Sequence, residues 1–143
     1  MDGKVIVIGA GASGIEAAGQ LARAGIKVTL IEKEKTTGGH IRNWFKLFPD
    51  RRDSSEVIDY LNKQYQHSNI TLKSGSTAEG ITTSNKNITV RLSDGEKIDA
   101  DAVIVSTGFD LFRSERKEEY GYGIYDNVIS SADLEKMFSE GKI

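Results

Sequence analysis

The stretch VIVIGAGASG (residues 5–14) joins a short apolar run to a glycine loop, and this junction decides the fold. The run from Lys4 to Ile8 has the pattern of a buried parallel strand. The residues after the glycines predict a helix with one buried face, formed by Ile15, Ala18, Leu21 and Ala22. Gly25 stands where the residue that ends this helix is expected. The sequence therefore begins with a strand–loop–helix unit.

The loop itself is Gly9-Ala10-Gly11-Ala12-Ser13-Gly14, a GxGxxG pattern. Gly9 permits the tight turn, Gly11 lets a pyrophosphate approach the backbone, and Gly14 lets the helix pack close to the strand. The helix N-terminus adds free N–H groups and partial positive charge for the phosphates. The loop predicts a dinucleotide-binding site.

A second apolar strand, residues 28–31, stops at Glu32, which is 18 positions after Gly14. This is near the spacing expected for the acid that accepts hydrogen bonds from the ribose hydroxyls. A carboxylate here disfavours a 2′-phosphate, so we do not expect an NADP-type ligand. A glycine-rich turn without a ligand is the alternative, and the strand–loop–helix–strand–Glu order favours the binding site.

The residues after Glu32 distinguish FAD from NAD. They read Lys33-Glu34-Lys35-Thr36-Thr37-Gly38-Gly39-His40, so a Gly-Gly pair follows the acid by six and seven positions. This arrangement resembles the extended motif of flavoproteins with two dinucleotide domains, and NAD domains usually lack the pair. An ordinary surface turn is the alternative for this segment.

The remaining sequence completes an α/β domain. Asp53 and Glu56 predict a capping box that opens a helix over residues 54–66, followed by a strand at 69–73. Residues 77–100 predict a three-stranded antiparallel meander with turns at Asn85-Lys86-Asn87 and at Asp94-Gly95. A last buried strand, residues 102–106, leads to Thr107-Gly108, and a helix is expected over 131–138. We therefore expect one Rossmann-type domain over residues 1–143: a parallel sheet flanked by helices, with an antiparallel meander.

Two blocks of the chain resemble the FAD-binding Rossmann half of the A subunits of heterodisulfide reductases, a family of iron–sulfur flavoproteins within the pyridine nucleotide-disulfide oxidoreductase-like superfamily. The blocks are VIVIGAGASGIEAAGQLARAGIKVTLIEKEKTTGGHIRNWFKLFP and VIVSTGFDLFRSERKEEYGYGIYDNVISSADLE. By this resemblance the loop from Gly9 to Gly14 holds the pyrophosphate of FAD, and Glu32 with Lys33 holds the adenosine ribose. Gly38, Gly39, His40 and Ile41 border the ribityl chain and ring, Thr77-Ala78 passes the adenine edge, and Thr107-Gly108 closes over the cofactor.

The chain also departs from the family's large members, which carry cluster-binding cysteines and an inserted second nucleotide domain. It has no cysteine, two histidines and a formal net charge of −2. We therefore expect no disulfide, thiolate nucleophile or protein-built metal site, and neither nucleic acid nor a membrane as partner. The expected location is the cytoplasm. A dedicated NADH site and heterodisulfide reduction by this chain alone are not expected.

Two function classes stay open. The first is an electron-transfer flavoprotein that works with a protein redox partner, such as a ferredoxin or an iron–sulfur subunit. The second is a non-catalytic FAD carrier, sensor or structural subunit of a redox complex. Trp44, Phe45 and Phe48 either screen the flavin ring or fill the core or an oligomer contact. Because a lone Rossmann unit offers little cover for the ring, we expect a homo-oligomer, most simply a dimer.

Overall fold

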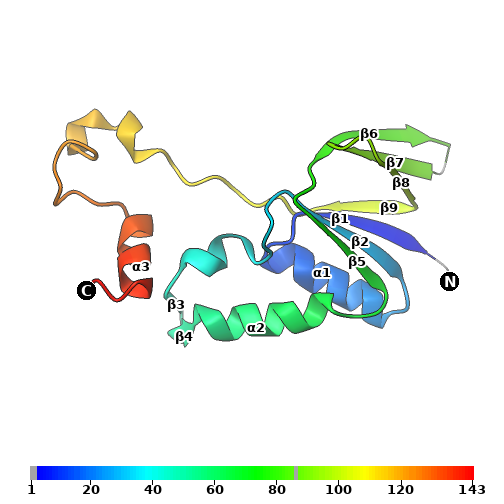
Figure 1. Ribbon diagram of the computed structural model, residues 1–143, viewed down its shortest axis with the longest axis horizontal. Coiled ribbons are helices and arrows are strands. Elements are labelled where there is room, and N and C mark those ends of the chain that lie inside the picture. Colours follow the sequence, from blue (N-terminus) through cyan, green and yellow to red (C-terminus); the bar gives the residue numbers. More distant parts are fainter. Residues whose placement is uncertain (1–2, 86) are drawn as a thin grey trace.

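The computed structural model describes residues 3–85 and 87–143 and is built on a four-stranded parallel sheet (Figure 1). The strands of this sheet lie in the order β5-β2-β1-β9, with β9 at the edge. Their bounds are β1 Lys4–Ile8, β2 Lys27–Glu32, β5 Ile70–Ser74 and β9 Ala102–Val105. The expected α/β class and the order of strands and helices are confirmed.

Two helices cover one face of the sheet: α1 (Ala12–Arg23) and α2 (Ser54–Tyr65). The residues that form the core between sheet and helices include Val5, Val7, Ile15, Ala18, Val28, Leu30 and Leu61. The helices approach closely at Gly19, where a Cβ would lie 2.9 Å from the Gln64 side chain. Gly25 ends α1 as expected: it has a φ of +84° and its N–H bonds to the carbonyl of Ala22.

The opposite face carries the antiparallel meander β6 (Ala78–Ser84), β7 (Asn87–Leu92) and β8 (Lys97–Ala100). It packs on the sheet through a second core of Ile6, Ile31, Val90, Leu92 and Ala100. The meander was expected from the sequence. The turn predicted at Asn85-Lys86-Asn87 includes Lys86, which lies outside the described residues.

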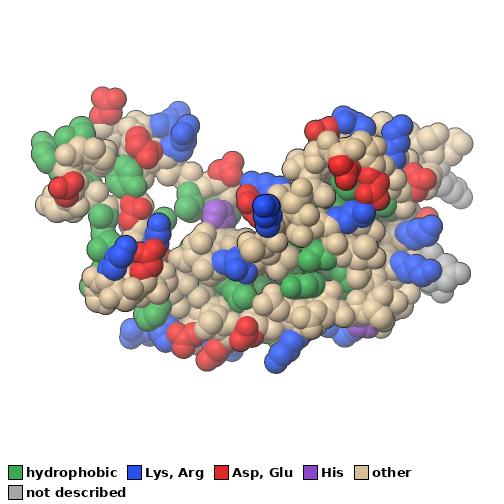
Figure 2. Space-filling model, viewed as in Figure 1, with side chains coloured by type: hydrophobic (Ala, Val, Ile, Leu, Met, Phe, Trp, Pro, Cys, Tyr) green, Lys and Arg blue, Asp and Glu red, His purple; other side chains and the backbone are tan. Residues whose placement is uncertain are grey.

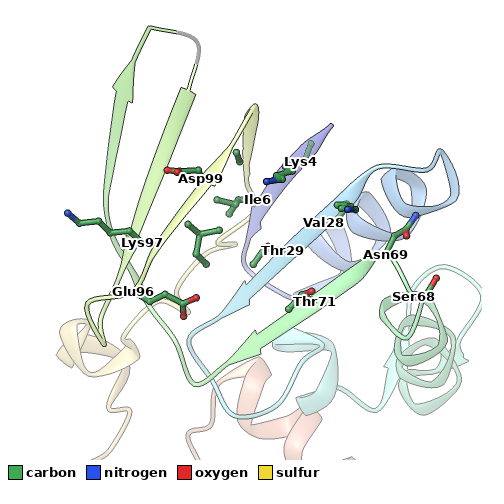
Figure 3. Close-up of a pocket in the computed structure, with 14 residues that line it drawn as sticks. Lys4, Ile6, Val28, Thr29, Ser68, Asn69, Thr71, Glu96, Lys97 and Asp99 are labelled. Carbon is green, nitrogen blue, oxygen red and sulfur yellow. The ribbon is translucent and has the colours of Figure 1, made fainter. Parts of the chain in front are cut away.

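The meander leaves part of the sheet uncovered at the amino ends of the strands. Thr29 and Thr71 face this opening, and with β8 they line a groove of about 500 Å³ (Figure 3). On the same face, Ile6 and Ile31 are buried against the meander, and Ile6 also lines the inner side of the groove. Hydroxyl-bearing side chains therefore stand where the sheet meets water, and large apolar ones where it is buried.

The segment between β2 and β5 contains a short 3₁₀ helix, η1 (Gly39–Asn43), and a two-stranded ribbon of β3 (Lys46–Leu47) and β4 (Arg52–Asp53). Asp53 precedes α2, but its side chain makes no capping hydrogen bond, so the capping box predicted for Asp53 and Glu56 is wrong. The Asp53 carboxylate instead pairs with the ammonium of Lys46 across the ribbon, at 2.5 Å.

Residues 106–143, here called the C-terminal arm, leave the sheet after β9 as an extended segment and end in α3 (Ser131–Ser139) beside η1 (Figure 1). Two 3₁₀ turns, η2 (Ser114–Arg116) and η3 (Glu118–Tyr120), lie between. The arm forms a lobe with apolar side chains on its surface (Figure 2). Its exposed large apolar residues include Phe109, Phe112, Tyr120, Ile124 and Tyr125.

A capping box does occur, at the start of α3. The Ser130 hydroxyl accepts the N–H of Asp133, and both the N–H and the hydroxyl of Ser130 donate to the Asp133 carboxylate. These bonds from Ser130 hold the pKa of Asp133 below its ordinary value. Tyr122 also donates its hydroxyl to Asp133 at 2.8 Å, and this bond raises the pKa of the phenol. Tyr122 therefore joins the segment before α3 to the first turn of that helix.

The arm contacts the rest of the chain at few points, chiefly near Phe45. The ring of Phe138 stacks on Phe45 with centroids 5.7 Å apart, and the Phe45 N–H donates to the Glu135 carboxylate at 2.8 Å. Phe138 is still 38% exposed, whereas Leu30 in the sheet core is 0% exposed. The arm therefore has its own, weaker local stability.

We predict that Leu30→Ala lowers the free energy of unfolding by about 2–5 kcal/mol, because it leaves a cavity in the main core. Phe138→Ala should leave the main denaturation midpoint nearly unchanged while hydrogen exchange in α3 becomes faster. Chemical denaturation and exchange mass spectrometry measure the two effects. Equal losses of global stability in both variants would show that arm and sheet unfold as one unit.

Candidate functional site

The glycine loop lies at the carboxyl ends of β1 and β9, and its three glycines stand in three different surroundings. Gly9 has a φ of +101°, and a Cβ there would lie 2.3 Å from the carbonyl oxygen of Ser106. A Cβ on Gly14 would lie 1.8 Å from the carbonyl oxygen of Gly9. A Cβ on Gly11 would meet nothing within 4 Å. Gly9 and Gly14 are therefore required by packing, and Gly11 faces open space.

The N-terminus of α1 opens onto this space. Ala12 begins the helix, and the first backbone N–H that bonds within it is that of Ile15, to the carbonyl of Gly11 at 3.0 Å. The first-turn N–H groups have no intrahelical partner by geometry, and the first turn carries no acidic residue. Free N–H groups, positive helix polarity and an open approach at Gly11 together fit a phosphate group.

Glu32, at the end of β2, is buried and has a role in the fold that the sequence did not indicate. One carboxylate oxygen accepts the N–H of Ala10 at 2.7 Å, and the other accepts the N–H of Glu34 at 2.9 Å. The carboxylate thereby joins the glycine loop to the segment after β2. Each oxygen keeps a second lone pair, so the predicted bond to ribose is compatible with this geometry. Its neighbour Lys33 is exposed.

The Gly-Gly pair packs directly beside the glycine loop. Gly38 has a φ of +104°, and its N–H donates to the carbonyl of Ala10 at 2.7 Å. A Cβ on Gly39 would lie 3.2 Å from the Cα of Gly11. His40 and Ile41 follow in η1. The pair is therefore no ordinary surface turn, since it lines one side of the open space at Gly11.

The other two predicted segments also meet at this end of the sheet. The backbone of Ser76 bonds to the carbonyl of Glu32 at 2.9 Å, which places Thr77 and Ala78 next to the buried acid. The backbone of Ser106 bonds to Ile8 at 2.7 Å, and a Cβ on Gly9 would lie 3.1 Å from the Cα of Thr107. Segments far apart in sequence thus gather around the loop, as expected where parallel strands end.

Sequence reasoning missed two participants, Thr37 and Phe109. Thr37 is buried, and its carbonyl accepts a bond from the Arg42 guanidinium at 3.1 Å, which braces the Gly-Gly turn. The carbonyl of Phe109 lies 2.7 Å from Nε2 of His40. A threonine before a Gly-Gly pair is a weak local signal, and the contact between residues 40 and 109 has no local signal at all.

Of the three aromatic residues after the Gly-Gly pair, Trp44 contacts a predicted site residue: its ring stacks loosely on His40, with centroids 6.5 Å apart. Phe45 contacts α3 through Phe138, and Phe48 is 95% exposed. Phe48 therefore does not fill the core. The groove at the amino ends of the strands is lined by none of the predicted site residues (Figure 3).

Residues 2–124 match the family described as pyridine nucleotide-disulphide oxidoreductase. The A subunit of the ferredoxin/F420H2-dependent CoB-CoM heterodisulfide reductase of Methanosarcina acetivorans is 27% identical over 216 residues, 94% of this chain and 27% of that protein. An iron-sulfur A subunit of the CoB–CoM heterodisulfide reductase of Methanopyrus kandleri is 27% identical over 222 residues, 97% of this chain and 33% of that protein. This chain thus spans a third or less of the length of these relatives.

Both aligned regions are longer than this chain, so the relatives contain inserted residues that it lacks. Among solved structures, L-proline dehydrogenase from P. horikoshii aligns with a TM-score of 0.66 and 26% identity, over 76% of this chain and 23% of that one. Lactococcus lactis thioredoxin reductase aligns with a TM-score of 0.69 and 21% identity, over 85% and 41%. The second likeness concerns the fold alone.

Gly14 and Gly11 provide a matched pair of substitutions. We predict that Gly14→Ala lowers the free energy of unfolding by about 1–3 kcal/mol, because the methyl group meets the Gly9 carbonyl. Gly11→Ala should lower the free energy of unfolding by less than about 1 kcal/mol. It should weaken FAD binding at least about tenfold, because its methyl group enters the space predicted for the pyrophosphate. Chemical denaturation of the FAD-free protein measures the change in stability of each variant, and calorimetry measures its affinity for FAD. Unchanged FAD affinity in Gly11→Ala would place the phosphates elsewhere.

Proposed function

The chain belongs to the pyridine nucleotide-disulphide oxidoreductase family, and on this premise we propose that residues 1–143 form one FAD-binding unit that exchanges electrons with a protein partner. The observation that carries the proposal is the gathering of the glycine loop, Glu32, the Gly-Gly turn and Thr107-Gly108 around the open space at Gly11.

Each of these groups has a chemical role toward FAD in this proposal. The first-turn N–H groups of α1 receive the pyrophosphate, because phosphate oxygens accept hydrogen bonds and carry negative charge. Glu32 and Lys33 receive the adenosine ribose, and Thr77-Ala78 lies beside the adenine. The backbone of Gly38, Gly39, His40 and Ile41 borders the ribityl chain and ring, while the His40 side chain contacts Phe109. When bound, FAD supplies the redox chemistry, and the chain binds and orients it.

The proposed partner is a ferredoxin or an iron–sulfur protein of a larger complex. The names of the relatives include ferredoxin and an iron-sulfur component, and this chain has no cysteine with which to hold a cluster of its own. A single glycine fingerprint supports FAD without a dedicated NADH site, and heterodisulfide reduction by this chain alone is not part of the proposal. Within the described residues, no helix is long and apolar enough to span a bilayer. The cytoplasmic location stays a prediction.

The second candidate is an FAD carrier, sensor or structural subunit of a larger redox complex. The exposed apolar surface of the C-terminal arm favours this candidate, because patches of this kind mark sites of association. A carrier holds FAD but gives no fast flavin reoxidation by a protein acceptor, and this separates the two functions.

We expect the purified protein to be yellow and to release FAD, not FMN, on denaturation, since an FMN site needs neither the pyrophosphate loop nor the ribose acid. Its oxidised flavin should be reduced by a reduced ferredoxin within the dead time of manual mixing, while micromolar NADH alone should not bleach the oxidised flavin. Absorbance spectroscopy follows both reactions. A colourless protein that binds NAD but not FAD in calorimetry would refute the cofactor, and bound FAD that exchanges no electrons with a protein partner would favour the carrier.

We further propose that the chain works as a homo-oligomer, most simply a two-fold dimer, in which the arm of one copy covers apolar surface of the other. The arm exposes Phe109, Phe112 and Tyr125 at 60% or more of their surface. Closed two-fold pairing is the commonest way in which identical chains bury such surface.

Phe112→Ser should therefore shift the FAD-loaded protein toward the monomer in light scattering at micromolar concentration. Ile81→Ser is the matched control, because Ile81 is an exposed apolar residue of β6, away from the arm, and its loss should leave the mass unchanged. A wild-type monomer that holds its flavin tightly would contradict the dimer.

A further inference from the structure

His40 lies at the edge of the proposed FAD site, but its side chain is engaged with the protein. Its Nε2 lies 2.7 Å from the carbonyl oxygen of Phe109, within hydrogen-bonding distance. Its ring also stacks on the ring of Phe109, with centroids 4.6 Å apart and an interplanar angle of 26°. A looser stack joins His40 to Trp44. With Nε2 as donor, His40 therefore makes a polar and an aromatic contact with one residue.

This contact joins the two turns that flank the open space at Gly11. His40 directly follows Gly38-Gly39, whose backbone is bonded to the glycine loop. Phe109 directly follows Thr107-Gly108, which passes Gly9 on the other side. The His40–Phe109 contact therefore closes the gap between the segments that the proposed function places along the ribityl side of FAD.

Little else holds the Phe109 side of this contact. Among residues 3–85 and 87–143, no backbone hydrogen bond ties residues 107–112 to the sheet. Gly108 has a φ of +72°, and a Cβ there would meet nothing within 4 Å. The Phe109 ring is 60% exposed. Without His40, this segment would be free to swing away with the rest of the arm.

We propose that His40 is a positioning residue that holds the Thr107-Gly108 turn closed beside the Gly38-Gly39 turn and so sets the rate at which FAD enters and leaves. The inference rests on the proposed function. A contact that closes the site equally before and after binding slows association and dissociation by the same factor, and leaves the equilibrium constant unchanged. By contrast, a direct contact between His40 and FAD would slow dissociation and raise the affinity by the same factor.

The test measures FAD association and dissociation by stopped-flow flavin fluorescence in four proteins. His40→Ala removes both contacts, and both rate constants should rise by up to about tenfold, the usual worth of one hydrogen bond, while the dissociation constant changes less than twofold. His40→Gln keeps an N–H donor and should recover most of the slow exchange. His67→Ala is the control, because the His67 ring accepts a hydrogen bond from the N–H of Asn69 in its own turn and is not among the residues of the proposed site, so its rates should equal those of the wild type.

A second readout needs no cofactor. The chain has one tryptophan, Trp44, and its ring stacks on His40. Neither His40→Ala nor His40→Gln keeps the stacked ring, and only His40→Gln keeps an N–H donor. Acrylamide quenching of Trp44 fluorescence in the FAD-free protein should therefore be greater in His40→Ala than in His40→Gln if loss of the bond opens the turn, with His67→Ala equal to the wild type. This measurement decides whether His40 holds the turn even if the wild type were to bind no FAD, an outcome that would refute the proposed function separately.

Two results would overturn the inference. If only dissociation became faster and the affinity fell by the same factor, His40 would contact FAD directly. If the rates did not change in His40→Ala and the quenching in His40→Ala equalled that in His40→Gln, the turn would be held closed by other contacts.

Discussion

The backbone of residues 9–14 can follow its path only because Gly9 and Gly14 carry no side chain. A methyl group at either position would collide with a backbone oxygen, of Ser106 or of Gly9. The absence of both allows the end of β1, the end of β9 and the start of α1 to meet. Two further segments attach to the backbone that results. The end of β2 attaches through Glu32, which accepts the N–H of Ala10, and the Gly-Gly turn attaches through the bond from Gly38 to the carbonyl of Ala10 and the contact of Gly39 with Gly11. The architecture of the site is thus a consequence of one steric constraint.

Sequence patterns predicted the parts of this arrangement that depend on local rules. The positions of the strands follow from apolar runs, the end of α1 from Gly25, and the different surroundings of Gly9, Gly11 and Gly14 from the loop motif. The capping box at Asp53 failed because the Lys46 ammonium competes for that carboxylate across a ribbon whose existence the sequence did not indicate. The contact between His40 and Phe109 could not be foreseen, since it depends on the direction in which the arm leaves the sheet.

The chain combines two regions that are stabilised differently. The sheet, its two helices and the meander bury large apolar side chains almost completely, as at Ile6, Leu30 and Val90. The C-terminal arm relies on the capping box of α3, the Tyr122–Asp133 bond and the stacking of Phe138 on Phe45. Polar and aromatic contacts at a partly exposed surface contribute less to stability than the burial of core side chains. Binding of another chain can therefore change the structure of the arm at a low cost in free energy.

Ala10 engages both of its backbone groups, the N–H with Glu32 and the C=O with Gly38. The conformational entropy of this loop is therefore lost during folding and not during ligand capture, which is the meaning of preorganisation. The Glu32 carboxylate bonds to the loop and is proposed to bond to a ligand as well. The effect of a single substitution at Glu32 therefore combines a free energy of folding with a free energy of binding. A double-mutant cycle that pairs Glu32 with the truncated ligand ADP would separate its contribution to loop order from its contribution to recognition.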